Sequence, residues 1–311
     1  DGTIQNQFSL SEYQGVLRVA STEGQWGRWW MDNPEPMTSN VVTLQPITDA
    51  TGHTTLEQVG IIEGIAPNET IWSARFVEDR AYIVTFENMD PLWTIDLSDP
   101  TNPTIMGELK IPGVSTYIHP ISDNTLLTIG MGPADLETGE GLDWSNVRLA
   151  LFEVADFTNP LETTTLSISP VEDENNPCWS WSSSEATYEH KAFQYWGPKE
   201  MLAVPLSTYR WVESDDGWYY EYVSKAIIVN VDEATGNMSI HGEVNHSSLL
   251  NHEDVNHWWG GDENIRRTIF MGDFIYAFSG AGITVHNLTS MELTDVVTFN
   301  IEFPKYSYYT D

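Results

Sequence analysis

The stretch Ile95-Asp96-Leu97-Ser98-Asp99-Pro100-Thr101-Asn102-Pro103 decides the fold, because a degenerate copy of it returns further along the chain. The turn Asp99-Pro100-Thr101-Asn102-Pro103 recurs as Asp156-Phe157-Thr158-Asn159-Pro160, and each copy follows an apolar run that reads as a strand. A unit that repeats roughly every 40–50 residues, with four short strands per unit, indicates a β-propeller. Abundant Trp and Tyr, 13 of each, also suit strands.

Five repeats can be followed through the chain, and three strands can be assigned in each. We expect the inner strands at 16–20, 81–85, 125–129, 201–205 and 274–278. We expect second strands at 41–44, 92–95, 149–152, 226–229 and 282–285. Third strands follow at about 56–61, 104–109, 162–168, 238–244 and 295–301. Gly, Pro, Asn and Asp bound these apolar or half-alternating runs, as stacked blades require.

The sequence therefore predicts an all-β fold, a β-propeller of four-stranded antiparallel blades. We expect one domain over 1–311, with blades at roughly 8–61, 72–112, 116–168, 186–245 and 265–303. A β-sandwich, or two of them, is the alternative fold, but it gives no reason for repeats of this period. The length of 311 residues suits one repeat domain.

Charge restricts the partners of the chain. It has 46 Asp and Glu against 13 Lys and Arg, a formal net charge of −33 at pH 7. Nucleic acid and anionic membrane surfaces are not expected as partners, because both need clustered Lys and Arg. The acidity has two interpretations, a solvated surface that favours solubility and loops that capture calcium. The acids are scattered without a calcium-loop pattern, which favours the first.

The cysteine content and the apolar runs bear on the compartment. Cys178 is the single cysteine, so no intrachain disulfide can form. No stretch is apolar for long enough to span a bilayer. The chain opens at Asp1 without Met, as a mature or trimmed product would.

Several further segments resemble one protein family in their residues and in their order along the chain. They are Gln7–Ala20, Arg75–Phe86 with Asp90-Pro91-Leu92 and Ile95–Pro100, Gly107–Gly113 with Tyr117-Ile118-His119-Pro120, and Tyr188–Phe193. These segments resemble secreted bacterial and archaeal proteins with a C-terminal β-propeller distantly related to WD repeats. The resemblance covers nearly the whole chain and implies a propeller exported to the cell surface, the periplasm or the medium. It implies no established reaction.

Members of that family usually carry more sequence before the segment that begins here at Gln7. Two or three blades are therefore expected to be missing, cleaved off or supplied by an N-terminal portion or a second chain. The alternative is a complete small propeller, closed by a strand near 3–8 that pairs with the run 296–303.

His119 and His190 hold similar places in consecutive repeats, each just before an inner strand, where Arg75 sits in the preceding repeat. Residues at that register in adjacent blades are expected to face the same rim of the central channel. Two neutral imidazoles can share a metal there, and a Cys178 thiolate would complete a His₂Cys set suited to copper or zinc. The structural alternative is that each histidine packs on a nearby tyrosine and that Cys178 is a buried thiol.

A second group of potential ligands lies between the fourth and fifth repeats. His246, His252 and His257, with Glu253 and Asp254, form the densest cluster of metal-ligating side chains in the sequence. The spacing is not the i, i+4 pair of a metalloprotease helix, although a loop can wrap a metal. A solvated loop is the alternative.

Tryptophan-rich insertions are the third candidate site. Trp26, Trp29, Trp30, Trp211, Trp218, Trp258 and Trp259 lie in long loops. Flat aromatic faces beside acids and amides suit sugar rings, whereas packing of the loops on each other is the structural alternative. Variable loops of repeat folds commonly carry binding.

Two functions remain open from sequence. The first is an exported module that binds a glycan, a small molecule or a protein at its loop face, with a metal at the channel rim. The second is an extracellular copper- or zinc-dependent enzyme with His119 and His190 as ligands. The enzyme needs an open coordination position beside a pocket. The first is favoured, because no acid–base or nucleophile set stands out.

Overall fold

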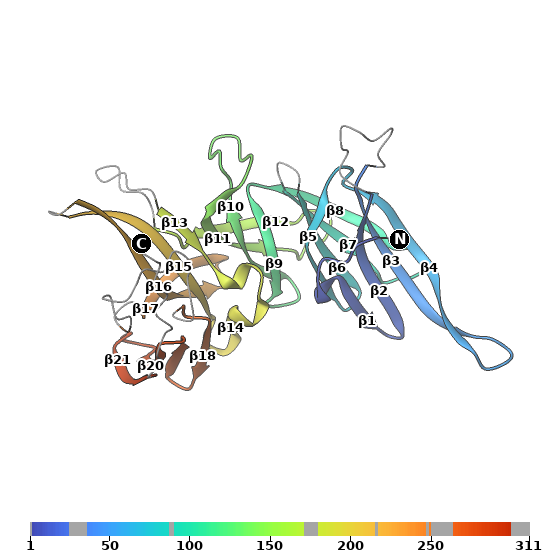
Figure 1. Ribbon diagram of the computed structural model, residues 1–311. Coiled ribbons are helices and arrows are strands. Elements are labelled where there is room, and N and C mark those ends of the chain that lie inside the picture. Colours follow the sequence, from blue (N-terminus) through green and yellow to red (C-terminus); the bar gives the residue numbers. More distant parts are fainter. Residues whose placement is uncertain are drawn as a thin grey trace, which may run out of the picture. The chain divides into compact units, whose positions relative to one another are not determined.

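The computed structural model describes residues 2–24, 36–86, 90–170, 180–214, 217–246, 249 and 264–299. These residues form five antiparallel sheets with short 3-10 helices, and no α-helix occurs among them (Figure 1). The predicted all-β fold of about five four-stranded blades is confirmed. The chain divides into two compact units, Asp1–Ser167 with Asp232–Met238, and Ile168–Val231 with Ser239–Asp311.

The first unit contains three sheets, each with its four strands in chain order. The first sheet follows the 3-10 helix η1 (Gln7–Ser9) and contains β1 (Leu10–Tyr13), β2 (Val16–Glu23), β3 (Thr38–Thr48) and β4 (Thr54–Ile65). The second contains β5 (Thr70–Val77), β6 (Arg80–Phe86), β7 (Asp90–Asp96) and β8 (Thr104–Ile111). The third contains β9 (Val114–Pro120), β10 (Thr125–Gly132), β11 (Asp143–Glu153) and β12 (Leu161–Ser167). The hairpin of β3 and β4 projects well beyond its sheet (Figure 1).

The other two sheets follow the same order. The fourth contains β13 (Ser180–Ser183), β15 (Met201–Ser214), β16 (Gly217–Asp232) and β17 (Asn237–Asn245), and β14 (Gln194–Trp196) pairs with β15. The connection from β13 to β15 contains η2 (Glu185–Thr187), η3 (His190–Ala192) and η4 (Gly197–Lys199). The fifth sheet contains β18 (Arg267–Met271), β19 (Phe274–Phe278), β20 (Gly282–Asn287) and β21 (Leu293–Thr298).

The strands that we expected to be the inner ones are second in their sheets, so that part of the prediction is wrong. In each of the first three sheets another strand, β1, β5 or β9, precedes them. β5 packs directly against β9. The first strands escaped notice because polar residues such as Ser73, Arg75, Thr116 and His119 interrupt their apolar pattern.

The core consists of apolar layers between successive sheets. One cluster, with Ala20, Val41, Ile83 and Ile95, joins the first and second sheets. Tyr82, Leu92, Ile118 and Phe152 belong to the cluster between the second and third sheets. Ala203, Ile228 and Ile275 contribute to the cluster between the fourth and fifth sheets. Each sheet thus buries apolar side chains against its neighbour, as stacked blades do.

The two copies of the repeated turn join the second sheet to the first and the third sheet to the second. The hydroxyl group of Thr43 in β3 donates to the carbonyl oxygen of Pro100 at 2.6 Å. The hydroxyl group of Thr94 in β7 donates to the carbonyl oxygen of Phe157, also at 2.6 Å. Pro100 and Phe157 are the second residues of the two copies of the turn. We call this arrangement the turn contact.

A glycine opposite each threonine allows the turn to approach closely. Thr43 pairs with Gly60 across β3 and β4, and Thr94 pairs with Gly107 across β7 and β8. A Cβ atom on Gly107 would lie only 2.7 Å from the carbonyl oxygen of Thr158, and one on Gly60 only 2.3 Å from that of Pro100. A larger residue would therefore force the turn away from the sheet.

Backbone pairing near the N-terminus is settled within the first unit. Thr3 donates its backbone N–H to the carbonyl oxygen of Thr22 at 2.8 Å and accepts from the N–H of Thr22 at 3.0 Å. Val296, in the run that we expected to pair with the N-terminal segment, pairs with Thr284 in β20. Pairing of 3–8 with 296–303 would join the two units, and it stays a prediction.

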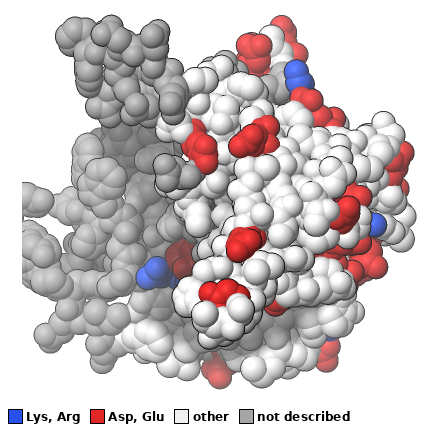
Figure 2. All heavy atoms as spheres, turned by 90° about the vertical axis from the view of Figure 1, so that its right-hand side faces the viewer, with Lys and Arg blue, Asp and Glu red and all other residues white. Residues whose placement is uncertain are grey.

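The acidic composition is visible on the surface. Figure 2 shows Asp and Glu side chains spread among uncharged residues, with few Lys or Arg between them. No helix of the described residues is long and apolar enough to cross a membrane.

Candidate functional site

A cavity of about 530 Å³ opens in the first unit at the edge where β4 and β8 end and β7 begins. Pro91 and Trp93 of β7 line it together with Glu108 and Lys110 of β8. Pro91 pairs with Lys110 and Trp93 with Glu108. Because alternate residues of a strand share one face, these four side chains lie on the same face of the second sheet. We call this hollow the Trp93 cavity.

Buried polar contacts fix the orientation of Trp93. Its indole Nε1–H donates to the hydroxyl oxygen of Thr85 at 3.1 Å, and the Thr85 hydroxyl group donates to the carboxylate of Glu69. Thr85 is completely buried, while Trp93 and Glu69 at the two ends of this relay are half-buried. The apolar side of Trp93 packs against the core between the first and second sheets. The ring is therefore set in place before any ligand arrives.

The facing wall is a strained segment between β4 and β5. Gly64, Ala66 and Pro67 line the cavity, and Ala66 has the left-handed backbone angle φ 49°. A non-glycine residue in this region is uncommon, and such strain often accompanies binding sites. The neighbouring Asn68 is held by its backbone N–H, which donates to the carbonyl oxygen of Met37 at 2.7 Å. The wall is thus fixed by the fold.

The charged groups around the cavity are mostly carboxylates. Glu69, Glu108 and Glu140 line it with a single cation, Lys110. The carboxylates are hydrogen-bond acceptors, and the ammonium group is a donor. An aromatic ring, apolar walls and a few converging polar groups are typical of small-molecule sites, and the volume lies within the usual range for them.

Arg75, predicted from its register, lies in an aromatic cluster on the first strands. Its guanidinium carbon is 4.5 Å from the ring centroid of Phe8 and 5.7 Å from that of Tyr117. The Tyr117 hydroxyl oxygen lies 3.3 Å from Nδ1 of His119. Arg75 in β5 and His119 in β9 therefore approach the same tyrosine from adjacent sheets.

The imidazole of His119 is neutral at physiological pH. Burial, and then the nearby positive charge of Arg75, lower the pKa of His119 to about 4. A neutral imidazole can bind a metal, but here it also packs on Tyr117, with ring centroids 6.2 Å apart. His119 therefore packs on the nearby Tyr117, as in the structural alternative.

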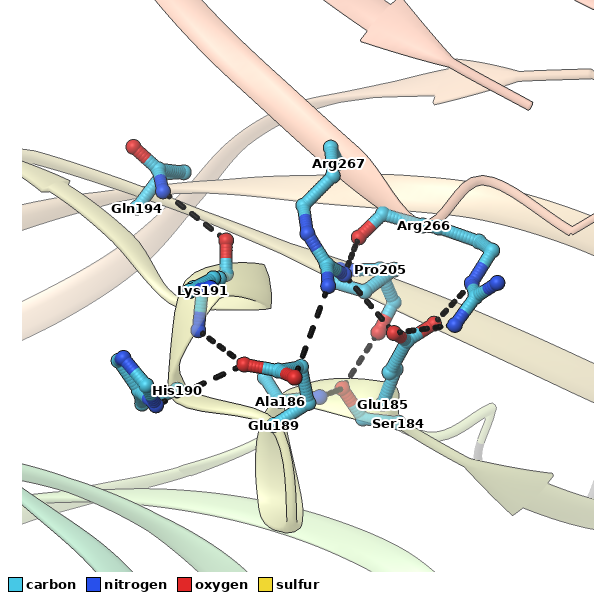
Figure 3. Close-up of polar contacts among 10 residues, drawn as sticks. All are labelled: Ser184, Glu185, Ala186, Glu189, His190, Lys191, Gln194, Pro205, Arg266 and Arg267. Carbon is cyan, nitrogen blue, oxygen red and sulfur yellow. Dashed lines mark hydrogen bonds and ion pairs between the residues drawn. The ribbon is translucent and has the colours of Figure 1, made fainter. Parts of the chain in front are cut away.

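His190 lies in the second unit, at the start of η3 (Figure 3). Its Nδ1 is 3.5 Å from a carboxylate oxygen of Glu189, which also accepts from the backbone N–H of Lys191 at 3.1 Å. Arg267 joins this group, with Nη2 3.8 Å from Glu189 and Nη1 2.8 Å from Glu185. His119 lies in the first unit and His190 in the second, so sharing of a metal between them stays a prediction, and Cys178 lies outside the described residues.

His246, the alternative ligand, uses both ring nitrogens for hydroxyl groups. Nδ1 lies 2.9 Å from the Ser279 hydroxyl oxygen, and Nε2 lies 2.7 Å from that of Thr284. A metal would have to displace one of these partners. His252 and His257 lie outside the described residues, so the three-histidine site stays a prediction.

The predicted tryptophan platform is described only in part. Trp211 and Trp218 were expected in a loop, but they lie in the strands β15 and β16 of one long hairpin, where Trp211 pairs with Tyr220 and Trp218 with Glu213. The other members of the platform, Trp26, Trp29, Trp30, Trp258 and Trp259, lie outside the described residues. Within the described ranges, no three His, Cys, Asp or Glu side chains gather into a metal-binding group.

Trp93 itself was not singled out from sequence. It sits in the middle of an apolar strand, where a tryptophan is normally a core residue. The signal that could have indicated an exposed face was the alternation of Pro91 and Trp93 on one strand with Glu108 and Lys110 on the next. Two charged side chains on a face of the sheet mean that this face is not fully buried.

Five antiparallel sheets in chain order, with turn contacts between the first and second and between the second and third, define a β-propeller with a ligand-sized cavity at one edge of its first unit. The chain belongs to the family described as Beta propeller domain, whose model matches residues 1–291.

Two archaeal proteins are similar to part of the chain. Uncharacterized proteins of Methanocaldococcus jannaschii and Archaeoglobus fulgidus are each 40% identical to it over 161 residues, which is 52% of this chain. The match covers 22% and 21% of these relatives, so the chain matches about a fifth of their length.

Solved structures with similar topology are more distant. The periplasmic gluconolactonase of Pseudomonas aeruginosa has 10% identity and a TM-score of 0.35, with 92% of this chain and 82% of that chain covered. The β-propeller domain of Cps50 (Swd1) from Myceliophteria thermophila has 11% identity and a TM-score of 0.37, with 95% and 87% covered. Identities this low carry no information about a shared activity.

Proposed function

We propose that this chain is a carbohydrate-binding module of an exported protein, and that the Trp93 cavity holds a sugar ring. The observation that carries the proposal is the fixed indole of Trp93 in a cavity of about 530 Å³ beside carboxylates. An aromatic ring offers an apolar face to the C–H groups of a sugar. Glu108 and Glu140 would accept hydrogen bonds from its hydroxyl groups, and Lys110 would donate one.

Charge narrows the class of sugar. Three carboxylates and one ammonium group surround the cavity, so a uronic or sialic acid would meet repulsion. Neutral sugars and amino sugars fit this balance. Export is part of the proposal and rests on the resemblance to secreted propeller proteins.

The test is binding of defined saccharides to the purified chain, measured by isothermal titration calorimetry. Cellobiose, mannobiose and a glucosamine dimer serve as neutral and amino sugars, and digalacturonate as the acidic one. We expect binding by at least one of the first group and none by digalacturonate. Trp93→Ala should weaken binding at least about tenfold, which corresponds to a loss of 1.4 kcal/mol. Glu108→Gln should weaken it less.

Trp181→Ala is the matched control, because Trp181 is an exposed tryptophan in β13, outside the cavity lining. It should bind as the wild type does. Circular dichroism would confirm that each variant is folded. If a wider panel of saccharides shows no binding, or if Trp181→Ala weakens binding as much as Trp93→Ala, the proposal is wrong.

A further inference from the structure

A second cavity, of about 300 Å³, lies in the first unit at the edge opposite the Trp93 cavity. It opens where β1 turns into β2, where β5 turns into β6, and beyond the end of β7. Residues of the first two sheets line it, among them Arg18, Gln45, Asp79 and Ser98. We call it the Arg18 cavity.

Arg18 is a buried cation with unused hydrogen-bonding capacity. The residue is only 4% exposed. One terminal nitrogen donates to the carbonyl oxygen of Glu78, and the other donates to the hydroxyl oxygen of Ser11 at 2.6 Å. Its Nε has no hydrogen-bond partner. A guanidinium group has five N–H donors, so these two contacts leave most of them available.

Two aromatic rings hold the guanidinium group in place. Its central carbon lies 5.4 Å from the ring centroid of Tyr13 and 5.2 Å from that of Phe76. Tyr13 comes from the first sheet and Phe76 from the second, so the cation is fixed from both sides. Such fixed placement lowers the entropy cost of binding a ligand.

The charge of Arg18 has no contact partner of opposite sign. The part of the chain that the structure describes shows no ion pair for Arg18, although acids outnumber bases by 46 to 13. Glu12 and Asp79 act on it only at longer range, and burial lowers the pKa of Arg18. A buried charge without a paired counter-charge is costly, and a bound carboxylate would remove that cost.

Asp79 places a negative charge on the same cavity. Its side chain is exposed and lines the hollow together with Arg18. A simple anion would be repelled by Asp79, and a simple cation would be repelled by Arg18. A ligand that carries both charges satisfies both groups. Gln45 and Ser98 add polar groups for the remainder of such a ligand.

We propose that the Arg18 cavity binds a small zwitterion of the amino-acid class, with its carboxylate on Arg18 and its ammonium group toward Asp79. This site is separate from the Trp93 cavity and does not depend on the carbohydrate proposal. The volume of about 300 Å³ suits a ligand of this size.

The test compares matched probes by isothermal titration calorimetry on the full chain. The common neutral amino acids are titrated first, and then propionate and ethylamine, each of which carries one charge of alanine. We expect at least one neutral amino acid to bind, and to bind at least about tenfold more tightly than propionate or ethylamine. Asp79→Asn should weaken amino-acid binding about tenfold and leave propionate binding unchanged or stronger.

Variants at the cavity separate binding from folding. Arg18→Lys should abolish amino-acid binding, and if it fails to fold, Ser98→Phe fills the hollow from an exposed position instead. Arg80→Gln is the matched control. Arg80 also donates to a carbonyl oxygen of the next sheet, that of Asp123 at 3.1 Å, and stacks on Phe157 at 5.2 Å, but it does not line the cavity.

The control should bind as the wild type does. Three results would each overturn the proposal: no neutral amino acid binds, propionate binds as tightly as the amino acids, or binding survives both Asp79→Asn and Ser98→Phe.

Discussion

Single buried residues carry much of the polar chemistry of this chain. Arg18, Thr85, Thr94 and His246 are all buried, and each makes hydrogen bonds that link separate segments. Because buried polar groups are costly unless they are paired, these contacts restrict where the segments can lie. The two cavities inherit their geometry from such residues.

His246 should make the protein sensitive to mild acid. Burial, and then the nearby His286, lower the pKa of His246 to about 4. The unfolded chain, with a pKa near 6.5, then takes up a proton that the folded chain refuses. The stability contributed by neutral His246 is therefore fully present above about pH 6.5 and is lost as the pH falls toward 4. The loss should reach about 2 kcal/mol at pH 5.

The measurement is the free energy of unfolding in urea at pH 7 and pH 5. His246→Gln removes the titrating group, so its stability should fall less between these two values than that of the wild type. His53→Gln serves as the control, because His53 is exposed on the β3–β4 hairpin. An equal decrease in wild type and His246→Gln would contradict the assignment.

At the scale of the elements, the turn contact explains why the repeat could be recognised in the sequence. The turn Asp99–Pro103 and its copy are conspicuous because Asp, Thr, Asn and the final Pro recur at the same positions. Asp99 accepts from the backbone N–H of Thr101 at 2.9 Å and from its hydroxyl group at 2.7 Å. Asp156 repeats this with Thr158 at 3.0 and 2.7 Å. These hydrogen bonds lower the pKa of both carboxyl groups.

The partner of the turn was harder to find. Thr94 and Gly107 lie on separate strands, and nothing in sequence pairs them until the register is known. A different contact connects the fourth sheet to the fifth. His241 in β17 lies 2.6 Å, through its Nε2, from the carbonyl oxygen of Leu288, which directly follows β20. A local pattern can therefore reveal strands and turns, but not which groups meet across sheets.

The candidate sites also depend partly on local sequence pattern and partly on contacts between distant segments. The register of Arg75 and His119 was predictable because equivalent residues of repeats share a position. The Trp93 cavity combines β7, β8, the β4–β5 connection and Glu140 from a distant loop. Only the folded chain brings these segments together.

Loss of one turn contact should destabilise the protein measurably. Thr94→Val keeps the shape of the side chain but leaves the carbonyl oxygen of Phe157 without its donor. We expect the free energy of unfolding to fall by about 1–3 kcal/mol. Urea denaturation provides the measurement, and Thr94→Ser, which retains the hydroxyl group, is the control. Equal stability of the Val and Ser variants would show that the hydrogen bond contributes nothing.

At the scale of the whole molecule, the most prominent property is the large negative charge. A formal net charge of −33 on 311 residues opposes compaction by self-repulsion. On the face that Figure 2 shows, the carboxylates are dispersed, so the repulsion among them is distributed there. Salt bridges such as Lys225–Glu243 at 2.9 Å are few by comparison and lie partly in solvent, where they contribute little.

Salt should therefore stabilise the folded chain. We expect the melting temperature to rise by a few degrees as sodium chloride increases from about 10 to 500 mM, because the Debye length falls from roughly 30 Å to a few ångströms over this range. Differential scanning calorimetry measures the shift. Potassium chloride at equal concentration is the control, and it should give the same rise because screening depends on ionic strength and not on the identity of the monovalent cation. A rise already complete with 1 mM calcium would instead indicate specific cation binding, the second interpretation of the acidic composition.

The turn contact also has a genetic consequence. Each of the first two sheets contains a threonine–glycine pair that contacts the turn of the following sheet. The second sheet also contains the turn that contacts the first sheet. A duplication or deletion of the DNA for the second sheet would therefore copy or remove both halves of the joint at once. The new neighbours meet with matching surfaces, with no further mutation required. Recombination that adds or removes such a sheet would therefore leave the joint between its neighbours intact.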